Sequence, residues 1–422
     1  MSLSFFFRLA LALATPAALA QSAQPAPTGP SFPPAGVAAG PATSGSAPGA
    51  GSGLAISLIL GGAYKASSLN PDTYRIGGFH APADAGWGPE RRGLGLGESE
   101  LGLSAQIDPW WRGVALIGLE PEGGISVEEA FVQTTAMGRG LTFKAGRFLS
   151  GIGYLNSQHA HTWDFADNPL AYQALLGTQY GDDGVQLRWL APTDQYLVLG
   201  LELGRGRGYP GTAQSRNGAG SSALTAHTGG DIGDDHNWRL GLSWLRARAN
   251  GQALAVTTAS GEPGDAEFSG TTRVWVIDGV WKWAPNGNAS RTSFKLQGEY
   301  LRSAREGALR MDPSGSDVTD RLRMAQSGAY LQGVWQFMPR WRVGLRGDWL
   351  QTGRADYGAN AAGLEASGYK PTRQTVMLDF SPSETSRLRL QLAHDRARPA
   401  SADRQLVLQY TMSLGAHAAH AY

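Results

Sequence analysis

The sequence predicts an all-β chain whose strands close into a transmembrane antiparallel β-barrel. Three observations support this prediction. Many segments alternate between apolar and polar residues, the connections between them alternate between short and long, and aromatic residues gather beside the short connections. Alternation with a period of two places one set of side chains on each face of a sheet. Short turns on one side, longer loops on the other and aromatic girdles are typical of outer-membrane barrels.

The first twenty residues, MSLSFFFRLALALATPAALA, predict a secretory signal peptide. Arg8 precedes an apolar run, and Ala18-Leu19-Ala20 fits the small-x-small cleavage rule. Residues 21–53 carry no charge and consist almost entirely of Pro, Ala, Gly and Ser. This composition predicts a disordered leader, because it cannot bury enough apolar surface to offset chain entropy. We therefore expect a signal peptide at 1–20, the leader at 21–53 and an exported barrel domain at 54–422.

The composition excludes several classes of protein. The chain has no cysteine, which rules out disulfides, thiol chemistry and Cys-ligated zinc sites. Its 36 basic and 35 acidic residues leave no net field that would attract nucleic acid. After the signal peptide, the sequence contains no run of about eighteen apolar residues, so it predicts no membrane-spanning helix. The mean hydropathy of −0.24 still suits a transmembrane barrel, since only every second strand residue faces lipid.

The clearest alternation occurs in three segments, WRVGLRGDW from Trp341, SRLRLQLAHD from Ser386 and QLVLQYTMSL from Gln405. Alone, this pattern also fits a soluble β-protein. The lengths of the connections and the aromatic residues beside them decide between a soluble protein and a transmembrane barrel. From Leu54 to Leu414 we count about sixteen strands, the number found in porins with an aqueous channel. An even number places both ends of the barrel on the periplasmic side, together with the short turns.

The predicted connections fall into two sets. The short ones are DPWW, MGRG, APTD, GDIGDDHN, APNGN, MPRW and SPSETS. The long polar ones are Lys65–Arg92, Leu149–Asp183, Arg205–Ser221, Asn250–Thr271, Ser303–Arg321 and Thr352–Thr372. Aromatic residues crowd the short set, namely Trp110, Trp111, Trp189, Trp238, Trp281, Trp283, Trp335, Phe337, Trp341 and Phe380. The chain also ends in an aromatic residue, Tyr422, shortly after the last predicted strand.

With these features, the sequence resembles the outer-membrane porins of Gram-negative bacteria, in particular the phosphate-selective and general porins. The segments AHTWDFADNPLAYQALLG, QYGDDGVQLRWLAPTD and WKWAPNGN resemble more closely a group often labelled as TonB-dependent receptors. The porin resemblance implies a passive channel for small hydrophilic solutes or ions in the outer membrane, in contact with its lipid and assembled as a homotrimer. The receptor resemblance leaves open the uptake of a scarce nutrient such as a metal chelate, although such receptors carry a plug domain that we do not find. An outer-membrane adhesin or enzyme is a third alternative.

The long connection Leu149–Asp183 follows the fifth predicted strand. In general porins the loop at this position folds into the lumen and narrows it, and the resemblance implies the same here. Asn168-Pro169 predicts the start of a helical turn through Leu170, Tyr172, Ala174 and Leu175. The apolar content of this turn favours docking on the barrel wall.

The alternation predicts which charged side chains face the lumen. The basic ones are Lys144, Arg188, Arg239, Lys282, Lys295, Arg342, Arg346, Arg373, Arg387 and Arg389. The acidic ones are Glu98, Glu100, Glu202, Asp278, Glu299, Asp348, Asp379 and Asp395. We hypothesise a pore constriction in which Asp164 and Asp167 of the loop face Lys295, Arg342, Arg346, Arg387 and Arg389. Opposed charges across a narrow passage orient dipolar solutes and select by charge and size.

His159 and His161 lie two residues apart in the same loop. Together with Asp164 they could bind zinc, because imidazole and carboxylate are suitable ligands. A single His-x-His pair is a weak signal, so we favour structural hydrogen bonds and expect neither metal nor cofactor. No serine near a histidine forms a recognisable nucleophile motif. We therefore predict no catalytic residue and no enzymatic activity.

Overall fold

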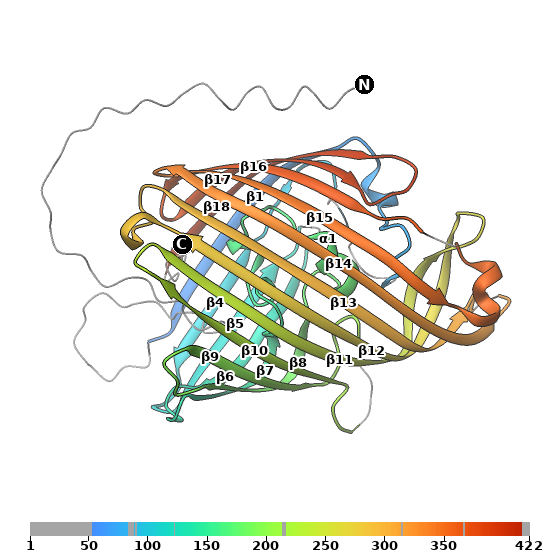
Figure 1. Cartoon of the computed structure of the whole chain (residues 1–422), viewed down its shortest axis with the longest axis horizontal. Helices are drawn as coiled ribbons and strands as arrows, with labels where there is room; N and C mark the ends of the chain where they lie inside the picture. The colour runs from blue at the N-terminus through green and yellow to red at the C-terminus, as the bar shows by residue number, and fades with distance from the viewer. Residues whose placement is uncertain are drawn as a thin grey trace, which may run out of the picture. The chain divides into compact units, whose positions relative to one another are not determined.

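The computed structural model describes residues 53–82, 88, 91–121, 123–212, 217–313, 315–365 and 368–415. The predicted signal peptide, the leader except for Gly53, and Tyr422 lie outside these residues. Within the described ranges, sixteen long strands form a closed antiparallel barrel, as predicted (Figure 1). The first eight are β1 (Ala55–Ser67), β4 (Glu100–Gln106), β5 (Trp111–Leu119), β6 (Ile125–Thr134), β7 (Leu141–Leu149), β8 (Gly181–Leu190), β9 (Tyr196–Gly204) and β10 (Ser221–Ile232). The other eight are β11 (His236–Thr257), β12 (Pro263–Trp283), β13 (Ser293–Met311), β14 (Val318–Met338), β15 (Trp341–Asp356), β16 (Thr372–Ser383), β17 (Ser386–Arg396) and β18 (Asp403–Gly415).

The barrel closes where β1 pairs with β18, from Ser57 opposite Gly415 to Ser67 opposite Gln405. On its other side β1 pairs with β4 and with the short β3 (Gly93–Leu96). Closure satisfies the backbone hydrogen bonds of the edge strands, which hydrocarbon could not do. The remaining short elements are β2 (Ala81–Pro82), α1 (Leu170–Leu176) and the 3-10 turns Pro71–Thr73, Ala160–Thr162, Pro285–Gly287 and Gly358–Gly363.

The outer face of the barrel is built for lipid. In β17, Leu388, Leu390 and Leu392 are 39%, 40% and 49% exposed, whereas the intervening Arg389 and Gln391 are buried in the interior. Aromatic pairs lie beside the short turns, for example Trp341 and Phe380 with ring centroids 4.6 Å apart. A closed barrel with this apolar exterior belongs in the outer membrane of a Gram-negative bacterium.

Among the described residues, no helix is both long enough and apolar enough to cross a membrane.

Two of the predicted long connections are wrong. Most of Asn250–Thr271 and Ser303–Arg321 belongs to strands, because β11 to β14 run 19 to 22 residues each. Along β11 the outward residues change from Leu240 and Leu242 to Arg248 and Asn250, while Leu254 and Val256 face inward and are buried. Polar residues outside and apolar residues inside indicate that the strands continue beyond the lipid. The polarity reversal made these extensions resemble loops.

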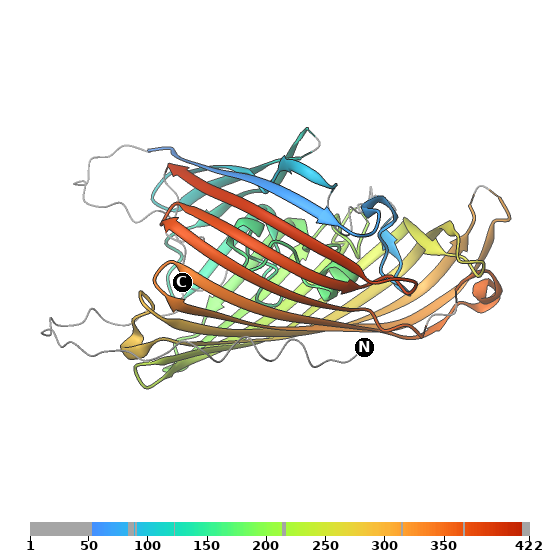
Figure 2. The ribbon, with the colours of Figure 1, turned by 90° about the horizontal axis from the view of Figure 1, so that it is seen from above.

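The connection after β7 folds into the barrel, as predicted. Figure 2 shows α1 inside the ring of strands, and all seven of its residues are buried. A second connection also contributes to the interior, since Ile76 and Phe79 from the β1–β4 connection join the same apolar cluster as Leu170 and Leu175. Further along this connection, β2 pairs with the extension of β11, with Pro82 opposite Leu254.

Candidate channel constriction

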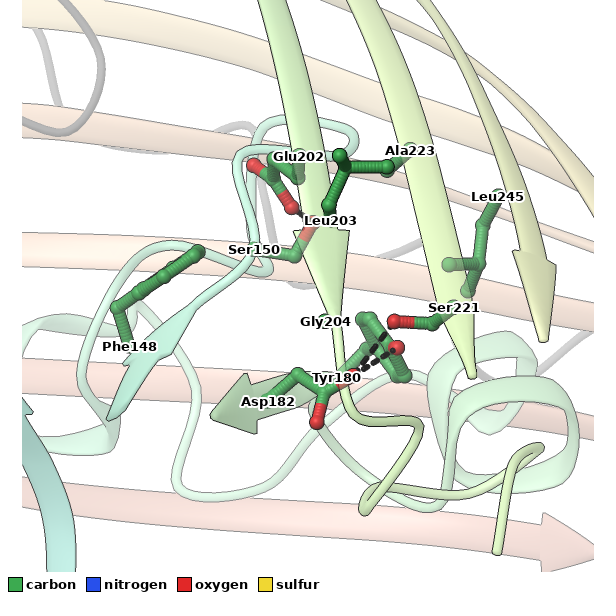
Figure 3. A pocket seen from close by; sticks show the side chains of 10 residues that line it. All are labelled: Phe148, Ser150, Tyr180, Asp182, Glu202, Leu203, Gly204, Ser221, Ala223 and Leu245. Atoms are coloured by element: carbon green, nitrogen blue, oxygen red, sulfur yellow. Dashed lines mark hydrogen bonds between the residues drawn. The ribbon is translucent and has the colours of Figure 1, made fainter. Parts of the chain in front are cut away.

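The inserted loop, residues 150–180, is fixed at both ends where it leaves β7 and enters β8. Ser150 donates a hydrogen bond to Glu202 of β9 at 2.5 Å, and the amide of Gly151 donates to the same carboxylate at 2.8 Å. At the other end, the hydroxyls of Tyr180 and Ser221 donate to Asp182 at 3.0 and 2.6 Å (Figure 3). These buried contacts hold the two ends of the loop against β8 to β10.

The middle of the inserted loop docks on β13 to β15. Tyr172 and Tyr330 both donate hydrogen bonds to the buried Glu299, at 2.8 and 2.7 Å. The amide of Leu155 donates to the same carboxylate at 2.9 Å. Gly328 of β14 leaves room for α1, because a Cβ at this position would lie 2.9 Å from the Cβ of Ala171. The predicted helical turn is therefore confirmed as α1, packed on the wall as expected.

The two loop acids contact the basic wall, which we define as Lys295, Arg342, Arg346, Arg373, Arg387 and Arg389. Asp164 forms ion pairs with Lys295 and, at 3.3 Å, with Arg342. Asp167 lies 2.9 Å from Arg346 and 2.8 Å from Arg373. Burial by itself would raise the pKa of the Asp167 carboxyl, but the charges of Arg346 and Arg373 outweigh it and lower that pKa to about 2. The Asp164 pKa is also lowered, because Lys295 and Arg342 outweigh the effect of burial.

Backbone carbonyls of the loop complete this contact. Arg387 donates to the carbonyl of His161 at 2.7 Å, and Arg389 donates to that of Trp163 at 2.9 Å. All seven residues hypothesised for the constriction therefore lie in one contact region. Their arrangement differs from the expectation in one respect, because the acids bind the basic side chains directly instead of facing them across an open passage. Paired charges bring the loop to the wall and neutralise each other there.

The first part of the loop contacts the opposite side of the barrel. The imidazole of His159 lies 2.9 Å from Glu100 of β4, and 3.1 and 3.0 Å from Glu128 and Glu129 of β6. In the closed ring, β6 is almost diametrically opposed to β13 and β15, and β4 is almost diametrically opposed to β13. The inserted loop thus spans the lumen. Burial opposes protonation of His159, but the surrounding glutamates outweigh it and raise the pKa of the imidazole well above its usual range.

The zinc ligands weighed in the sequence are not assembled as a set. His161 stacks on His159 with ring centroids 5.9 Å apart, and Asp164 is engaged by Lys295 and Arg342. The carboxylates nearest to His159 come from the barrel wall instead. Sequence reasoning predicted that Glu100 faces the lumen but missed its contact with His159, and it missed Glu128 and Glu129 altogether. Two consecutive glutamates in a strand expected to alternate were a visible irregularity.

Another loop contact involves His80, which precedes β2. Its Nε2 lies 3.0 Å from the hydroxyl of Tyr357, and its carbonyl accepts from Tyr209 at 3.3 Å. Burial and the nearby charge of Arg305 lower the pKa of His80 to about 4. Burial raises the pKa of Tyr357 to about 12. Sequence reasoning did not single out this contact, because its partners are far apart in the chain.

Solved structures share the barrel fold. A Vibrio cholerae outer membrane protein, OmpT, covers 86% of this chain and 97% of its own, with 8% identity and a TM-score of 0.51. Its trimer form matches with 10% identity and a TM-score of 0.50 over 86% of this chain and 99% of its own. An anion-selective porin from Comamonas acidovorans matches with 13% identity and a TM-score of 0.50, covering 86% of this chain and 100% of its own.

No protein-family model matches the sequence. A relative from Aquifex aeolicus, described as an uncharacterized protein, is 31% identical over 356 residues. The match covers 79% of this chain and 71% of the relative. The chain therefore belongs to the family of this Aquifex aeolicus protein, and its barrel is that of the Gram-negative outer-membrane porins.

Proposed function

We propose that the chain is a non-catalytic, porin-like channel through which small hydrophilic solutes or ions diffuse, and that the inserted loop controls its passage. The observation that supports this proposal most is the loop's path across the lumen, with His159 at one wall and Asp164 and Asp167 at the other. A loop in this place restricts the cross-section that is open to solutes. The charged and polar side chains around it then determine which solutes pass.

The barrel size also favours a channel over a TonB-dependent receptor. Sixteen long strands match porins, whereas outer-membrane transporters of the plugged type have about twenty-two. Two buried serines, Ser150 and Ser221, donate to the carboxylates of Glu202 and Asp182 at the ends of the inserted loop. Neither donates to a histidine that would activate it as a nucleophile.

Single-channel recording in planar bilayers tests the proposed function. We expect the purified chain to conduct ions, and a deletion of residues 157–178 to conduct more. Asn156 suits the new junction, because it accepts a hydrogen bond from the amide of Tyr180 at 2.7 Å and from the side chain of Gln179 at 2.9 Å. The barrel should survive the deletion, since its strands supply their own hydrogen bonds.

Heat-modifiable migration of both proteins in electrophoresis serves as the control for barrel formation. Equal conductance of the folded deletion variant and the wild type would refute a controlling role for the loop. Absence of conductance in both folded proteins would refute the channel itself.

We also propose assembly as a homotrimer, which the trimer form of the Vibrio cholerae protein suggests. Chemical cross-linking in native membranes should give a trimer, whereas a purely monomeric pattern would contradict this proposal.

A further inference from the structure

His159 of the inserted loop lies in a cluster of acidic side chains from the barrel wall. Three glutamate carboxylates surround this one imidazole. Nδ1 lies 2.9 Å from Oε2 of Glu100 and 3.1 Å from Oε2 of Glu128, while Nε2 lies 3.0 Å from Oε2 of Glu129. Lys144 of β7, whose charge acts on Glu129, has its ammonium group 4.2 Å from the centre of the Phe131 ring.

A β-bulge brings two of these carboxylates to the same place. Consecutive strand residues normally point to opposite faces, so Glu128 and Glu129 should not both reach the lumen. The pairing of β5 with β6 shifts register here, since Leu116 is opposite Glu129 and Ile117 is opposite Val127. Glu128 is left without a partner across the strand and turns inward. Bulges of this kind re-aim side chains and are common beside functional sites.

A glycine on the neighbouring strand makes room for the re-aimed side chain. A Cβ at Gly118 would lie 2.5 Å from Oε1 of Glu128. The Glu128 side chain remains 26% exposed, so solutes can reach the carboxylates from this side.

Glu100 gives a second indication that the cluster is incomplete. The residue is only 4% exposed, and its Oε2 lies 2.9 Å from Nδ1 of His159 but outside hydrogen-bond geometry with any described residue. A buried carboxylate oxygen without a donor is costly unless a cation compensates it. The hydrogen bond of Nε2 to Glu129 directs Nδ1 toward both Glu100 and Glu128. A single proton on Nδ1 cannot serve two carboxylates equally, whereas a metal ion can.

We propose that Nδ1 of His159 and the carboxylates of Glu100 and Glu128 bind a divalent first-row transition-metal cation such as Zn²⁺ or Mn²⁺. One imidazole with two carboxylates suits these ions. The three ligand atoms already lie within 4.8 Å of one another, and two ligands of one tetrahedral zinc ion are roughly 3.4 Å apart. Glu129 holds the other ring nitrogen and orients the imidazole, as carboxylates commonly do around metal-bound histidines. The bound ion would fasten the inserted loop to β4 and β6.

Isothermal titration of the purified, tag-free chain with Zn²⁺ and with Mn²⁺ tests this proposal. We expect one ion to bind per chain, and the variants Glu128→Gln and His159→Gln to lose that binding. Glu129→Gln should weaken binding about 10- to 100-fold, because it removes only the orienting partner. His227→Gln is the matched control, since His227 is also buried beside a carboxylate, Asp278 at 3.6 Å, but lies outside the cluster.

Glu128 is the most exposed of the three glutamates, so Glu128→Gln is the variant least expected to disturb folding. Heat-modifiable migration identifies the variants that form the barrel, and only those are compared. X-ray absorption of the zinc-loaded chain should show a nitrogen and oxygen shell at about 2.0–2.2 Å. Absence of binding in the folded wild type, or unchanged binding in folded Glu128→Gln and His159→Gln, would overturn the metal site. His159 would then be a protonated imidazole held by its carboxylates alone.

Discussion

The Asp167 carboxylate accepts a hydrogen bond from the guanidinium of Arg346 at 2.9 Å, so the inserted loop is bound to the barrel wall. Asp167→Asn would replace the anion with a neutral amide and leave Arg346 and Arg373 with less compensating charge. We expect docking of the loop to lose about 1.5–3 kcal/mol, the range for hydrogen bonds to charged groups. Conductance should rise, and the reversal potential in a salt gradient should shift toward anion selectivity.

Asp183→Asn is the matched control for this change. Asp183 also pairs with an arginine, Arg147 at 2.7 Å, but both side chains are about one-third exposed and lie on β7 and β8. Exposed ion pairs contribute little, so its conductance and selectivity should stay near those of the wild type. If Asp167→Asn behaved like Asp183→Asn, the pairing with Arg346 would not hold the loop.

The close approach of α1 to β14 can be tested with a single methyl group. Gly328→Ala would place its Cβ 2.4 Å from Cδ2 of Leu350, a side chain that can turn aside, and 2.9 Å from the Cβ of Ala171. The Cβ and Cα of Ala171 are fixed on the helix, so α1 has to move. Overpacking of this kind costs about 1–3 kcal/mol, and thermal unfolding should occur at a lower temperature. Gly62→Ala is the control, because a Cβ at Gly62 has no atom within 4 Å. Equal unfolding temperatures for the two variants would contradict docking of α1 at this place.

Protonation of His80 should release the segment that precedes β2. The hydroxyl of Tyr357 and the cation of Arg305 act on this imidazole, while Tyr209 donates to the carbonyl of His80. In the docked segment the pKa of His80 is about 4, below its ordinary value of 6.5. Between pH 4 and pH 6.5 the released segment therefore binds more protons than the docked one. Docking is therefore unaffected above pH 6.5 and weakens as the pH falls toward 4, by roughly 3 kcal/mol in total.

Hydrogen exchange of residues 74–82, followed by mass spectrometry at pH 7, 5.5 and about 4, measures this release. After correction for the intrinsic dependence of exchange on pH, protection should fall in the wild type. His80→Gln cannot titrate in this range, so its protection should be independent of pH. The same loss of protection in both proteins would assign the effect to another group.

Much of this architecture follows from local chemistry in the sequence. Lipid on one side and water on the other force the alternation seen in β17, and a proline that interrupts this alternation, as in MPRW, marks a short turn. The position of the inserted loop follows from counting strands, and Asn168-Pro169 marks the start of α1. These features depend on neighbouring residues, so one sequence was enough to predict them.

The remaining features depend on residues that are distant in the chain. The extensions of β11 to β14 reverse the polarity of their faces, because they leave the lipid and cover an apolar cluster that includes Leu254, Phe268 and Leu364. The bulge at Glu128 arises from register with β5, which alternation alone does not reveal. Similarly, the sequence placed Asp164 opposite the basic wall, but the distance between them depends on how deeply the loop enters the lumen.

The orientation of the barrel can be tested directly, because the chain contains no native cysteine. Longer loops of outer-membrane barrels face the exterior and short turns face the periplasm. Ser260 is exposed in the turn between the extended strands β11 and β12, and Glu384 is exposed in the short turn between β16 and β17. We expect a membrane-impermeant maleimide to label Ser260→Cys in intact cells. It should label Glu384→Cys only after the outer membrane is permeabilised, since that turn lies at the opposite end of the strands. Labelling of Glu384→Cys alone in intact cells would reverse the orientation and place the extensions of β11 to β14 in the periplasm.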